Sequence, residues 1–384
     1  MKFVQRVSML VLWLFTLVFY NKTVIVSFST YHQTMYNSFD KTLAYATQKL
    51  QYVTEKVTYV TETMVYAMKK TQTENPKIPL FHGRNISTEF ESYYTNASAA
   101  ELMDPFINQH RYELLINQNL KCKGKNIFLL VFIHVAPGNF AERILIRSTI
   151  GTVLSFQNRR IEHVFVLGKT ENITLQKEIQ HESRKYMDII QGNFIDSYRN
   201  LTYKLVFSLF WVNNFCNNAK FVIKMDDDIT INIPLLVPYL TEKLNAGQAS
   251  NVLECKTITE NVPVRDMNNK WFITLEEYPF TKFLPYCAGH SSLMSIDVVR
   301  KMYRASKNVP YLWLEDVYGS GFLSLLLKIN MFMPTFYVEP VISSLHSQPC
   351  SLFYLNILKN DTNSLEMWNT ITTFENRLNC SISF

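Results

Sequence analysis

Glycine, charged residues and clustered basic residues are all scarce in this chain of 384 residues. Only 10 glycines are present, which excludes collagen-like and glycine-linker proteins. Charged residues make up 18% of the chain and hydrophobic residues 47%, so an intrinsically disordered chain is also excluded. The net charge is only +6 and no basic run accompanies it, so no nucleic-acid partner is expected. The length predicts one main domain of about 250 residues together with additional segments.

The cysteines lack the CxxC and Cys/His spacings that are typical of zinc sites. Their even number is compatible with disulfides in an oxidising compartment, although six cysteines allow 15 pairings and the sequence does not select one. Asn-X-Ser/Thr sequons add weak support for a lumenal glycoprotein. The six cysteines are Cys122, Cys216, Cys255, Cys287, Cys350 and Cys380.

The N-terminus has the pattern of a membrane anchor. Lys2 and Arg6 precede an apolar run over residues 7–28 that only a short polar stretch interrupts. Cationic residues before such a run place the N-terminus in the cytoplasm. We therefore expect a cytoplasmic tail over residues 1–6 and an uncleaved signal-anchor transmembrane helix over 7–28, with the chain from about residue 29 onward in the lumen. A cleaved signal peptide is the alternative, but no small-x-small cleavage site follows the run.

A heptad repeat lies between residues 43 and 72, where a tyrosine recurs every seven residues. Apolar residues alternate by three and four beside these tyrosines, as they do along the seam of a coiled coil. The pattern predicts a helical segment that dimerises the protein, within a lumenal stem over residues 29–120. An extended Thr-rich spacer is the alternative, because Thr and Val are weak helix formers. The catalytic domain would then occupy residues 121–384.

From Asn126 onward, apolar β-branched runs alternate with helical patterns. This alternation predicts an α/β domain with a mainly parallel sheet, in which ligands bind beyond the carboxyl ends of the strands. The predicted strands are 126–135, 161–168, 187–190 and 220–225, and the predicted helices are 139–150, 171–186 and 200–215.

Three adjacent aspartates, Asp226, Asp227 and Asp228, follow the last of these strands. Three carboxylates repel one another and lose hydration when buried, so they need a cation or solvent. Alternate residues of an extended chain point the same way, so Asp226 and Asp228 are expected to share one ligand. Oxygen ligands suit Mn²⁺ or Mg²⁺, which complete their shell with substrate phosphates. A solvated acidic turn is the alternative.

A second acidic pair, Glu315 and Asp316, lies among apolar and aromatic residues in YLWLEDVYG. A carboxylate at such a pocket wall can act as a general base. The pair can equally cap the helix predicted through GFLSLLLKI, and the two roles are compatible.

Two arginines and a late histidine are further candidates. Arg143 and Arg147 share a helix face and could hold phosphate through paired hydrogen bonds, with a surface ion pair as the alternative. His346 is a candidate metal ligand because the carboxylates already suggest a cation, although a lone histidine is more often structural.

Several motifs occur in one order within about residues 122–350. They are ERILIRSTIG, FVLG, DIIQGNFIDSYRNLTYKLVFSLFWVNNFC, KFVIKMDDDITIN, YPFTKFLPYCAG and EDVYG. Together they resemble the β-1,3-galactosyltransferase family, the type II Golgi enzymes of glycosyltransferase family 31. The resemblance does not extend to the heptad stem.

The resemblance implies a GT-A-like, Rossmann-type nucleotide-sugar-binding domain and assigns roles to individual residues. It implies that Asp316 is the catalytic base and that Asp228 and His346 bind the metal. It also implies donor-binding positions at Arg143, Arg147, Lys204, Asp226, Asp227 and Glu315.

The reaction implied by the resemblance is an inverting, Mn²⁺- or Mg²⁺-dependent transfer of a hexose to a glycan acceptor on protein or lipid. Galactose from UDP-galactose and a β-1,3 linkage are expected, with N-acetylglucosamine or N-acetylgalactosamine as alternatives. The expected location is the Golgi membrane, as a single-pass type II protein.

The sequence also departs from the family pattern. Ile150 replaces a tryptophan, and Gly319-Ser320-Gly321-Phe322 lacks a cysteine expected after EDVY. A disulfide that uses this cysteine is therefore expected to be absent or rearranged. A catalytically inactive lumenal glycan-binding or scaffold module is the alternative that these departures suggest.

Overall fold

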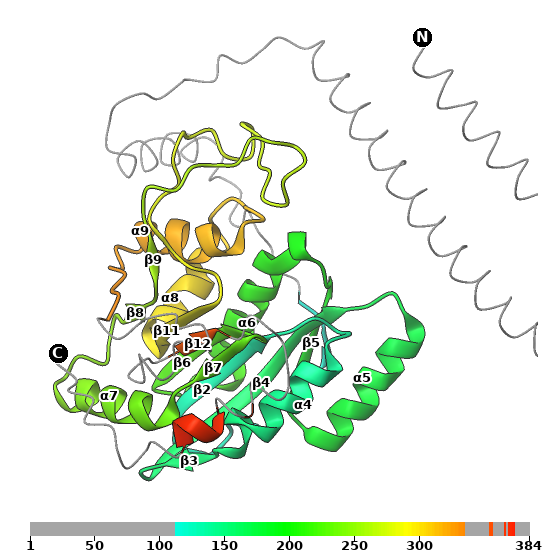
Figure 1. The fold of residues 1–384 in the computed structure, drawn as a ribbon, viewed down its shortest axis with the longest axis vertical. Coiled ribbons are helices and arrows are strands. Elements are labelled where there is room, and N and C mark those ends of the chain that lie inside the picture. The colour runs from blue at the N-terminus through cyan, green and yellow to red at the C-terminus, as the bar shows by residue number, and fades with distance from the viewer. Residues whose placement is uncertain (1–111, 335–352, 356–364, 366–367, 373–384) are drawn as a thin grey trace, which may run out of the picture. The chain divides into compact units, whose positions relative to one another are not determined.

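The structure is a computed structural model in which one folded unit is described (Figure 1). The described residues are 112–334, 353–355, 365 and 368–372. All of them belong to the second of two compact units of the chain, residues 79–384.

Several predicted features lie outside the described residues, namely the membrane anchor over 7–28, the heptad stem over 43–72 and the candidate ligand His346. Within the described part of the chain, no helix combines the length and the apolar character that crossing a membrane requires.

A mixed sheet of eight strands forms the centre of the domain, and its four middle strands are parallel, as the sequence predicts (Figure 1). The strand order is β1-β5-β4-β2-β6-β11-β8, with β3 paired to β4 beside this path. The parallel strands are β2 (Ile127–His134), β4 (Arg159–Lys169), β5 (Ile189–Ile195) and β6 (Phe221–Asp226). The others are β1 (Leu114–Ile116), β3 (Ser155–Phe156), β8 (Leu253–Glu254) and β11 (Ser291–Ser295).

Antiparallel strands extend this parallel core on both sides. β1 pairs with β5, and β11 pairs with both β6 and β8. β1 lies before residue 121, in the stretch that the sequence assigns to the stem.

Helices cover both faces of the sheet, and the apolar strand residues divide between two cores accordingly. One core packs against α6 and α8, and the other against α4, α5 and α7. This is why the central strands are apolar on both faces. The helices are α4 (Phe140–Ser148), α5 (Ile173–Tyr186), α6 (Leu201–Phe215), α7 (Ile233–Asn245) and α8 (Ile296–Ala305). The three helices predicted from the sequence, α4 to α6, are confirmed within a few residues at their ends.

Several short elements connect these layers. They are η1 (Ile150–Thr152), η2 (Tyr198–Asn200), β7 (Ile229–Ile231), β9 (Thr257–Ile258), β10 (Tyr286–Cys287), the π-helix η3 (Val317–Leu323), α9 (Ser324–Leu326) and β12 (Phe353–Leu355).

The strand order reverses direction between β2 and β6. From β2 the chain moves outward to β4 and β5, and then α6 returns it to β6 on the other side of β2. Ligands of open α/β sheets bind at such a switch point, beyond the carboxyl ends of the strands. A ligand-binding site is therefore expected in the loops that follow β2 and β6.

Two disulfides form within the described residues, Cys122–Cys216 and Cys255–Cys287. The first ties the segment before β2 to the end of α6, and the second ties the segment after β8 to β10. Phe322, which lies where the family pattern has a cysteine, is buried and stacks on Tyr278 with ring centroids 6.1 Å apart. Aromatic packing thus occupies that position.

Replacing Cys122 and Cys216 together by alanine is expected to lower the free energy of unfolding by about 2–5 kcal/mol. The cross-link spans 94 residues, so its loss frees a long loop in the unfolded chain. Urea denaturation with and without reductant measures the effect. Reduction should destabilise the wild type more than the variant, and equal stability of the two proteins under oxidising conditions would contradict the prediction.

Candidate active site

A pocket of about 640 Å³ lies at the carboxyl ends of β2 and β6. Acidic side chains form one part of its lining and aromatic side chains another. The lining residues used below are His134 to Pro137, Asn139, Asp196, Tyr198, Lys204, Asp226 to Asp228, Trp271, Trp313, Glu315 and Asp316. Six of the predicted site residues therefore meet in one cavity: Lys204, Asp226, Asp227, Asp228, Glu315 and Asp316.

The aspartate triplet reaches the pocket through a turn. β6 ends at Asp226, and Asp227 and Asp228 turn the chain into β7. Asp227 and Asp228 therefore do not continue the extended strand, and the alternation of side chains expected from an extended chain does not apply to them. Asp227 accepts a hydrogen bond from the side-chain amide of Asn139 at 2.5 Å. The turn brings all three carboxylates to the cavity and ties them to the loop after β2.

A buried lysine, Lys224, neutralises part of this acidic cluster. Its ammonium lies 2.8 Å from Asp226 and 3.6 Å from Glu315, and it donates a hydrogen bond to the Gly289 carbonyl. Burial alone would lower the pKa of Lys224, but the charges of Asp226 and Glu315 outweigh it, and the pKa lies above its ordinary value. Lys224 therefore stays charged and joins β6 to two other segments of the pocket wall.

The second acidic pair begins the π-helix η3, as the capping interpretation predicts. Asp316 Oδ1 accepts a hydrogen bond from the Val317 N–H at 2.9 Å. Burial raises the pKa of Glu315 to about 7, and burial also raises the pKa of Asp316. Ser320 fixes this helix start, because its hydroxyl donates to the Asp316 carbonyl at 2.7 Å and accepts from the Cys287 N–H at 2.8 Å.

Lys204 supports the pocket from α6. Its ammonium pairs with Asp196 at 2.8 Å and donates to the Val135 carbonyl at 3.0 Å. Its side chain is only 3% exposed, so the charge is balanced inside the wall. Lys204 therefore fixes the end of β2 where the pocket begins.

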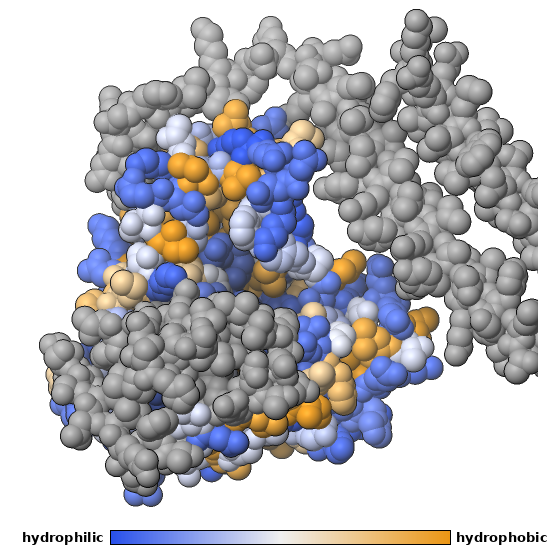
Figure 2. Space-filling view, viewed as in Figure 1, coloured by the Kyte–Doolittle hydropathy of each residue, from blue (hydrophilic) through white to orange (hydrophobic). Residues whose placement is uncertain are grey.

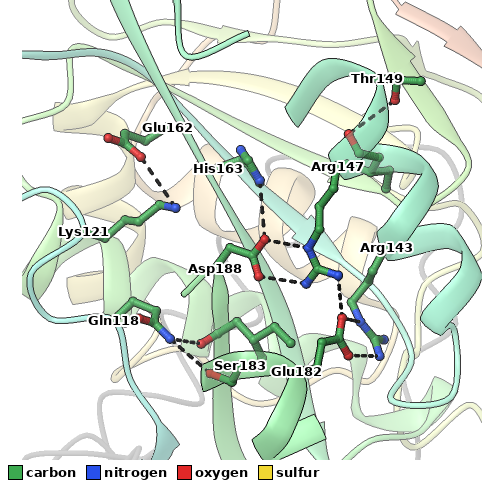
Figure 3. A network of polar contacts seen from close by, with 12 residues as sticks. Gln118, Lys121, Arg143, Arg147, Thr149, Glu162, His163, Glu182, Ser183 and Asp188 are labelled. Atoms are coloured by element: carbon green, nitrogen blue, oxygen red, sulfur yellow. Dashed lines mark hydrogen bonds and ion pairs between the residues drawn. The ribbon is translucent and has the colours of Figure 1, made fainter. Parts of the chain in front are cut away.

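Arg143 and Arg147 lie outside the pocket lining, in a buried charge network on α4 (Figure 3). Arg143 forms a two-pronged ion pair with Glu182 at 2.8 and 2.7 Å. Arg147 contacts Glu182 at 2.7 Å and Asp188 at 2.8 Å. Burial would raise the pKa of Asp188, but hydrogen bonds from Arg147 lower it to about 2. The partners are thus on α5 and just before β5.

Arg143 also reaches toward the pocket through the backbone. Its Nη1 donates to the carbonyls of Ala136 and Pro137 at 3.0 and 3.2 Å, and both of these residues line the cavity. In this structure Arg143 positions the loop after β2, Arg147 holds its acidic partners, and neither arginine lines the cavity.

Sequence reasoning did not identify His134, Tyr198 and Trp271 as pocket residues, or Lys224 as the cation behind the acidic wall. Lys224 interrupts an apolar strand, which is the one signal that could have marked it. His134 ends β2 with its Nε2 3.0 Å from Ser208 Oγ, and burial lowers its pKa well below the ordinary value, so it is neutral. The two aromatic residues carry no local signal, because their roles depend on contacts between distant segments.

The chemistry of the pocket is compatible with a divalent cation held partly by a substrate. In the described part of the chain, no three His, Cys, Asp or Glu side chains converge closely enough to hold an ion by themselves. Mg²⁺ and Mn²⁺ commonly use one or two carboxylates and complete their shell with phosphate oxygens. Asp228 and its neighbours offer carboxylates of this kind at the cavity.

Comparison with known proteins places these features in a family. The galactosyltransferase family model matches residues 141–334. Human beta-1,3-galactosyltransferase 9 is 37% identical over 257 residues, which cover 63% of this chain and 69% of that protein. Mouse beta-1,3-galactosyltransferase 1 is 36% identical over 212 residues, which cover 55% of this chain and 64% of that protein.

Solved structures give a weaker likeness. A glycosyltransferase involved in the glycosylation of the major capsid of PBCV-1 is 6% identical, with 62% of this chain and 98% of that chain covered at a TM-score of 0.35. The WbbM bifunctional glycosyltransferase is 10% identical, with 64% and 50% covered at the same TM-score of 0.35. Neither likeness carries weight at this score.

The raised pKa of Glu315 predicts that stability depends on pH. The folded protein binds this proton more tightly than the unfolded chain does, with a pKa of about 7 against an ordinary 4.5. The free energy of unfolding should therefore fall by roughly 3 kcal/mol as the pH rises between these two values. Glu315→Gln, which is neutral at every pH, should lose the part of this slope that Glu315 contributes, in urea denaturation with a chelator present.

Glu260 provides the matched control, because its side chain is 76% exposed. Glu260→Gln should keep the wild-type slope. A Glu315→Gln variant whose stability changes with pH as the wild type does would contradict the assignment.

Proposed function

The chain belongs to the galactosyltransferase family of hexosyltransferases, the family of the β-1,3-galactosyltransferases, and from this premise we propose that it transfers galactose from UDP-galactose to a glycan hydroxyl. The proposed product is a β-1,3 linkage on a protein or lipid glycan. The observation that carries the proposal is the convergence of Asp226 to Asp228 with Glu315 and Asp316 in one cavity at the sheet's switch point. The relatives, which are beta-1,3-galactosyltransferases, support the choice of sugar and linkage.

The proposed donor site lies at the ends of β2 and β6, in a GT-A-like arrangement. Asp226 ends β6 and Asp227 follows it, where the resemblance implies contacts with the donor ribose and phosphates. The neighbouring wall after β2 is held by Lys204 and, through backbone carbonyls, by Arg143. A wall that is fixed before binding loses little freedom when the donor enters.

Asp228 is the proposed ligand of a Mn²⁺ or Mg²⁺ ion, together with His346, which lies outside the described residues. The acidic cavity supports this choice, because its carboxylates outnumber the ammonium of Lys224. When bound, such an ion neutralises the charge on the departing diphosphate.

Asp316 is the proposed base. An acceptor hydroxyl gives its proton to the Asp316 carboxylate while the hydroxyl oxygen attacks C1 of the sugar from the face opposite UDP. One displacement inverts the anomeric centre. The raised pKa of Asp316 supports this role, since a base accepts a proton more readily as its pKa approaches the working pH. Its neighbour Glu315 lies against Lys224 and is less suited to the task.

The departures from the family pattern support an active enzyme more than an inactive scaffold. Ile150 packs in the core on the face of the sheet that α4 and α7 cover. Phe322 stacks on Tyr278 in the other core. Both changes thus alter packing, and the carboxylates of the pocket remain in place. N-acetylglucosamine and N-acetylgalactosamine are the alternative donor sugars.

The proposed location is the Golgi membrane, with the anchor over residues 7–28 and the catalytic domain in the lumen. The heptad stem would pair two copies of the chain. The two disulfides of the described domain support an oxidising compartment.

Asp316→Asn is expected to lower the rate of galactose transfer by about 10²–10⁴-fold, because the amide does not accept the acceptor's proton. The affinity for UDP should not change. Transfer assays and calorimetric titration of the detergent-solubilised full chain with UDP measure the two quantities. Galactose transfer by Asp316→Asn at the wild-type rate would show that Asp316 is not the base.

Asp228→Ala is expected to abolish Mn²⁺-dependent binding of UDP and UDP-galactose in the same calorimetric titration. Glu171→Ala, at an exposed position before α5, is the matched control and should bind as the wild type does. The proposed donor site would be refuted if the folded wild type bound neither nucleotide in the presence of Mn²⁺. UDP-N-acetylglucosamine bound in preference to UDP-galactose would change the donor sugar.

A further inference from the structure

The aromatic side of the pocket takes no part in the chemistry proposed above. Tyr198 and Trp271 both line the cavity, and they are 49% and 46% exposed. The indole Nε1 of Trp271 donates a hydrogen bond to the Tyr198 hydroxyl at 2.7 Å. The polar atom of the indole is therefore satisfied by its neighbour, and the exposed area of the pair is largely aromatic carbon.

The loop that carries Trp271, residues 259–285 between β9 and β10, is held in one conformation. Arg265 donates to the backbone carbonyls of Ile273 and Tyr278 at 2.7 Å, and also to those of Thr274 and Phe280. The Cys255–Cys287 disulfide ties the two ends of the loop together. Figure 1 shows this yellow-green loop projecting beyond the sheet, and Figure 2 shows hydrophobic side chains among hydrophilic ones over it.

Two cations lie over the faces of the aromatic rings, Lys270 over Trp271 and Tyr198 and Arg199 over Trp313. The Lys270 ammonium lies 4.4 Å from the centre of the Trp271 ring. The Arg199 guanidinium lies 3.7 Å from the centre of the Trp313 ring, and it donates to the Phe272 carbonyl at 3.4 Å. These contacts link η2 to the loop, so the aromatic rings are in place before any ligand arrives.

The aromatic pair and the acidic pair face the same space. Trp313 lies 6.3 Å from Tyr198, ring centre to ring centre, and Glu315 and Asp316 follow it closely in the sequence. Burial, together with the charges of Asp316 and Glu315, raises the pKa of Tyr198, which places these carboxylates within electrostatic range of its hydroxyl. A ligand lying on the rings therefore has its rim close to the proposed base.

Only some ligands match such a surface. A pyranose ring presents a face of C–H bonds and a rim of hydroxyls, so it can pack its face on an aromatic ring while a rim hydroxyl reaches a carboxylate. We propose that Trp271 and Tyr198 form a stacking platform for the terminal pyranose of the acceptor glycan, which presents one hydroxyl to Asp316. This inference rests on the proposed function.

The test compares Trp271→Ala, which removes the ring, with Trp271→Phe, which keeps an aromatic face. Met267→Ala is the matched control, because Met267 is 79% exposed in the same loop and does not line the pocket. The measured quantities are KM for UDP-galactose and KM for the methyl β-glycosides of galactose, N-acetylglucosamine and N-acetylgalactosamine.

Trp271→Ala should raise the KM for the acceptor glycoside by about 10-fold or more and leave the KM for UDP-galactose within about 2-fold. Trp271→Phe should raise the acceptor KM by less than about 3-fold, and Met267→Ala should leave both constants unchanged. An acceptor KM for Trp271→Ala equal to that of Met267→Ala would overturn the proposal. So would an equal rise in both constants, since the indole would then bind the nucleotide or merely support the loop.

Saturation-transfer NMR separates failure of this inference from failure of the proposed function. If the wild type transfers galactose to no glycoside, the reaction is in doubt, but binding can still be measured. Transfer of saturation to ring protons of a glycoside in the wild type and not in Trp271→Ala would support the platform. No saturation transfer from the folded wild type to any of the three glycosides would refute it.

Discussion

The pocket depends on one buried ammonium. Six carboxylates line the cavity, and only that of Asp196 is paired with Lys204. Without a further cation among the other five, their mutual repulsion and loss of hydration would oppose folding. Lys224 lies between Asp226 and Glu315 and also binds the Gly289 carbonyl, so it joins three segments of the wall by one charge. It does not neutralise the whole cluster, because Lys204 is already balanced by Asp196. The remaining negative charge is what makes the cavity suitable for a divalent cation and unsuitable for a free anion.

A second charge network stabilises the loop after β2. Arg143, Arg147, Glu182 and Asp188 balance one another outside the cavity lining (Figure 3). Replacing one member would leave a buried charge without its partner, which is far more costly than the pair itself is worth. Because Arg143 also binds the carbonyls of Ala136 and Pro137, this balance fixes the loop after β2. This charge network lies outside the cavity lining, but it thereby keeps the pocket wall in place.

The parallel strands of the central sheet could be predicted from the sequence alone, whereas the short strands that flank them could not. The strands β2, β4 and β6 are continuous apolar runs, and that pattern predicts burial on both faces without knowledge of their neighbours. The short strands β8 and β11 depend on pairing with distant segments, which no local pattern encodes. The same limit applies to side chains. The spacing of Arg143 and Arg147 predicted a shared helix face, but their partner Glu182 lies 39 and 35 residues away.

The two sides of the pocket are built in different ways, and this has a functional consequence. The acidic side lies at the ends of sheet strands and at the start of a helix, where both cores hold the backbone. The aromatic residue Trp271 lies on a loop that Arg265 and one disulfide hold in place. A change near the indole can alter what stacks on it while the carboxylates keep their own supports, since Trp271 contacts this side of the pocket through Tyr198. In such an arrangement the choice of acceptor can vary while the chemistry of transfer stays the same.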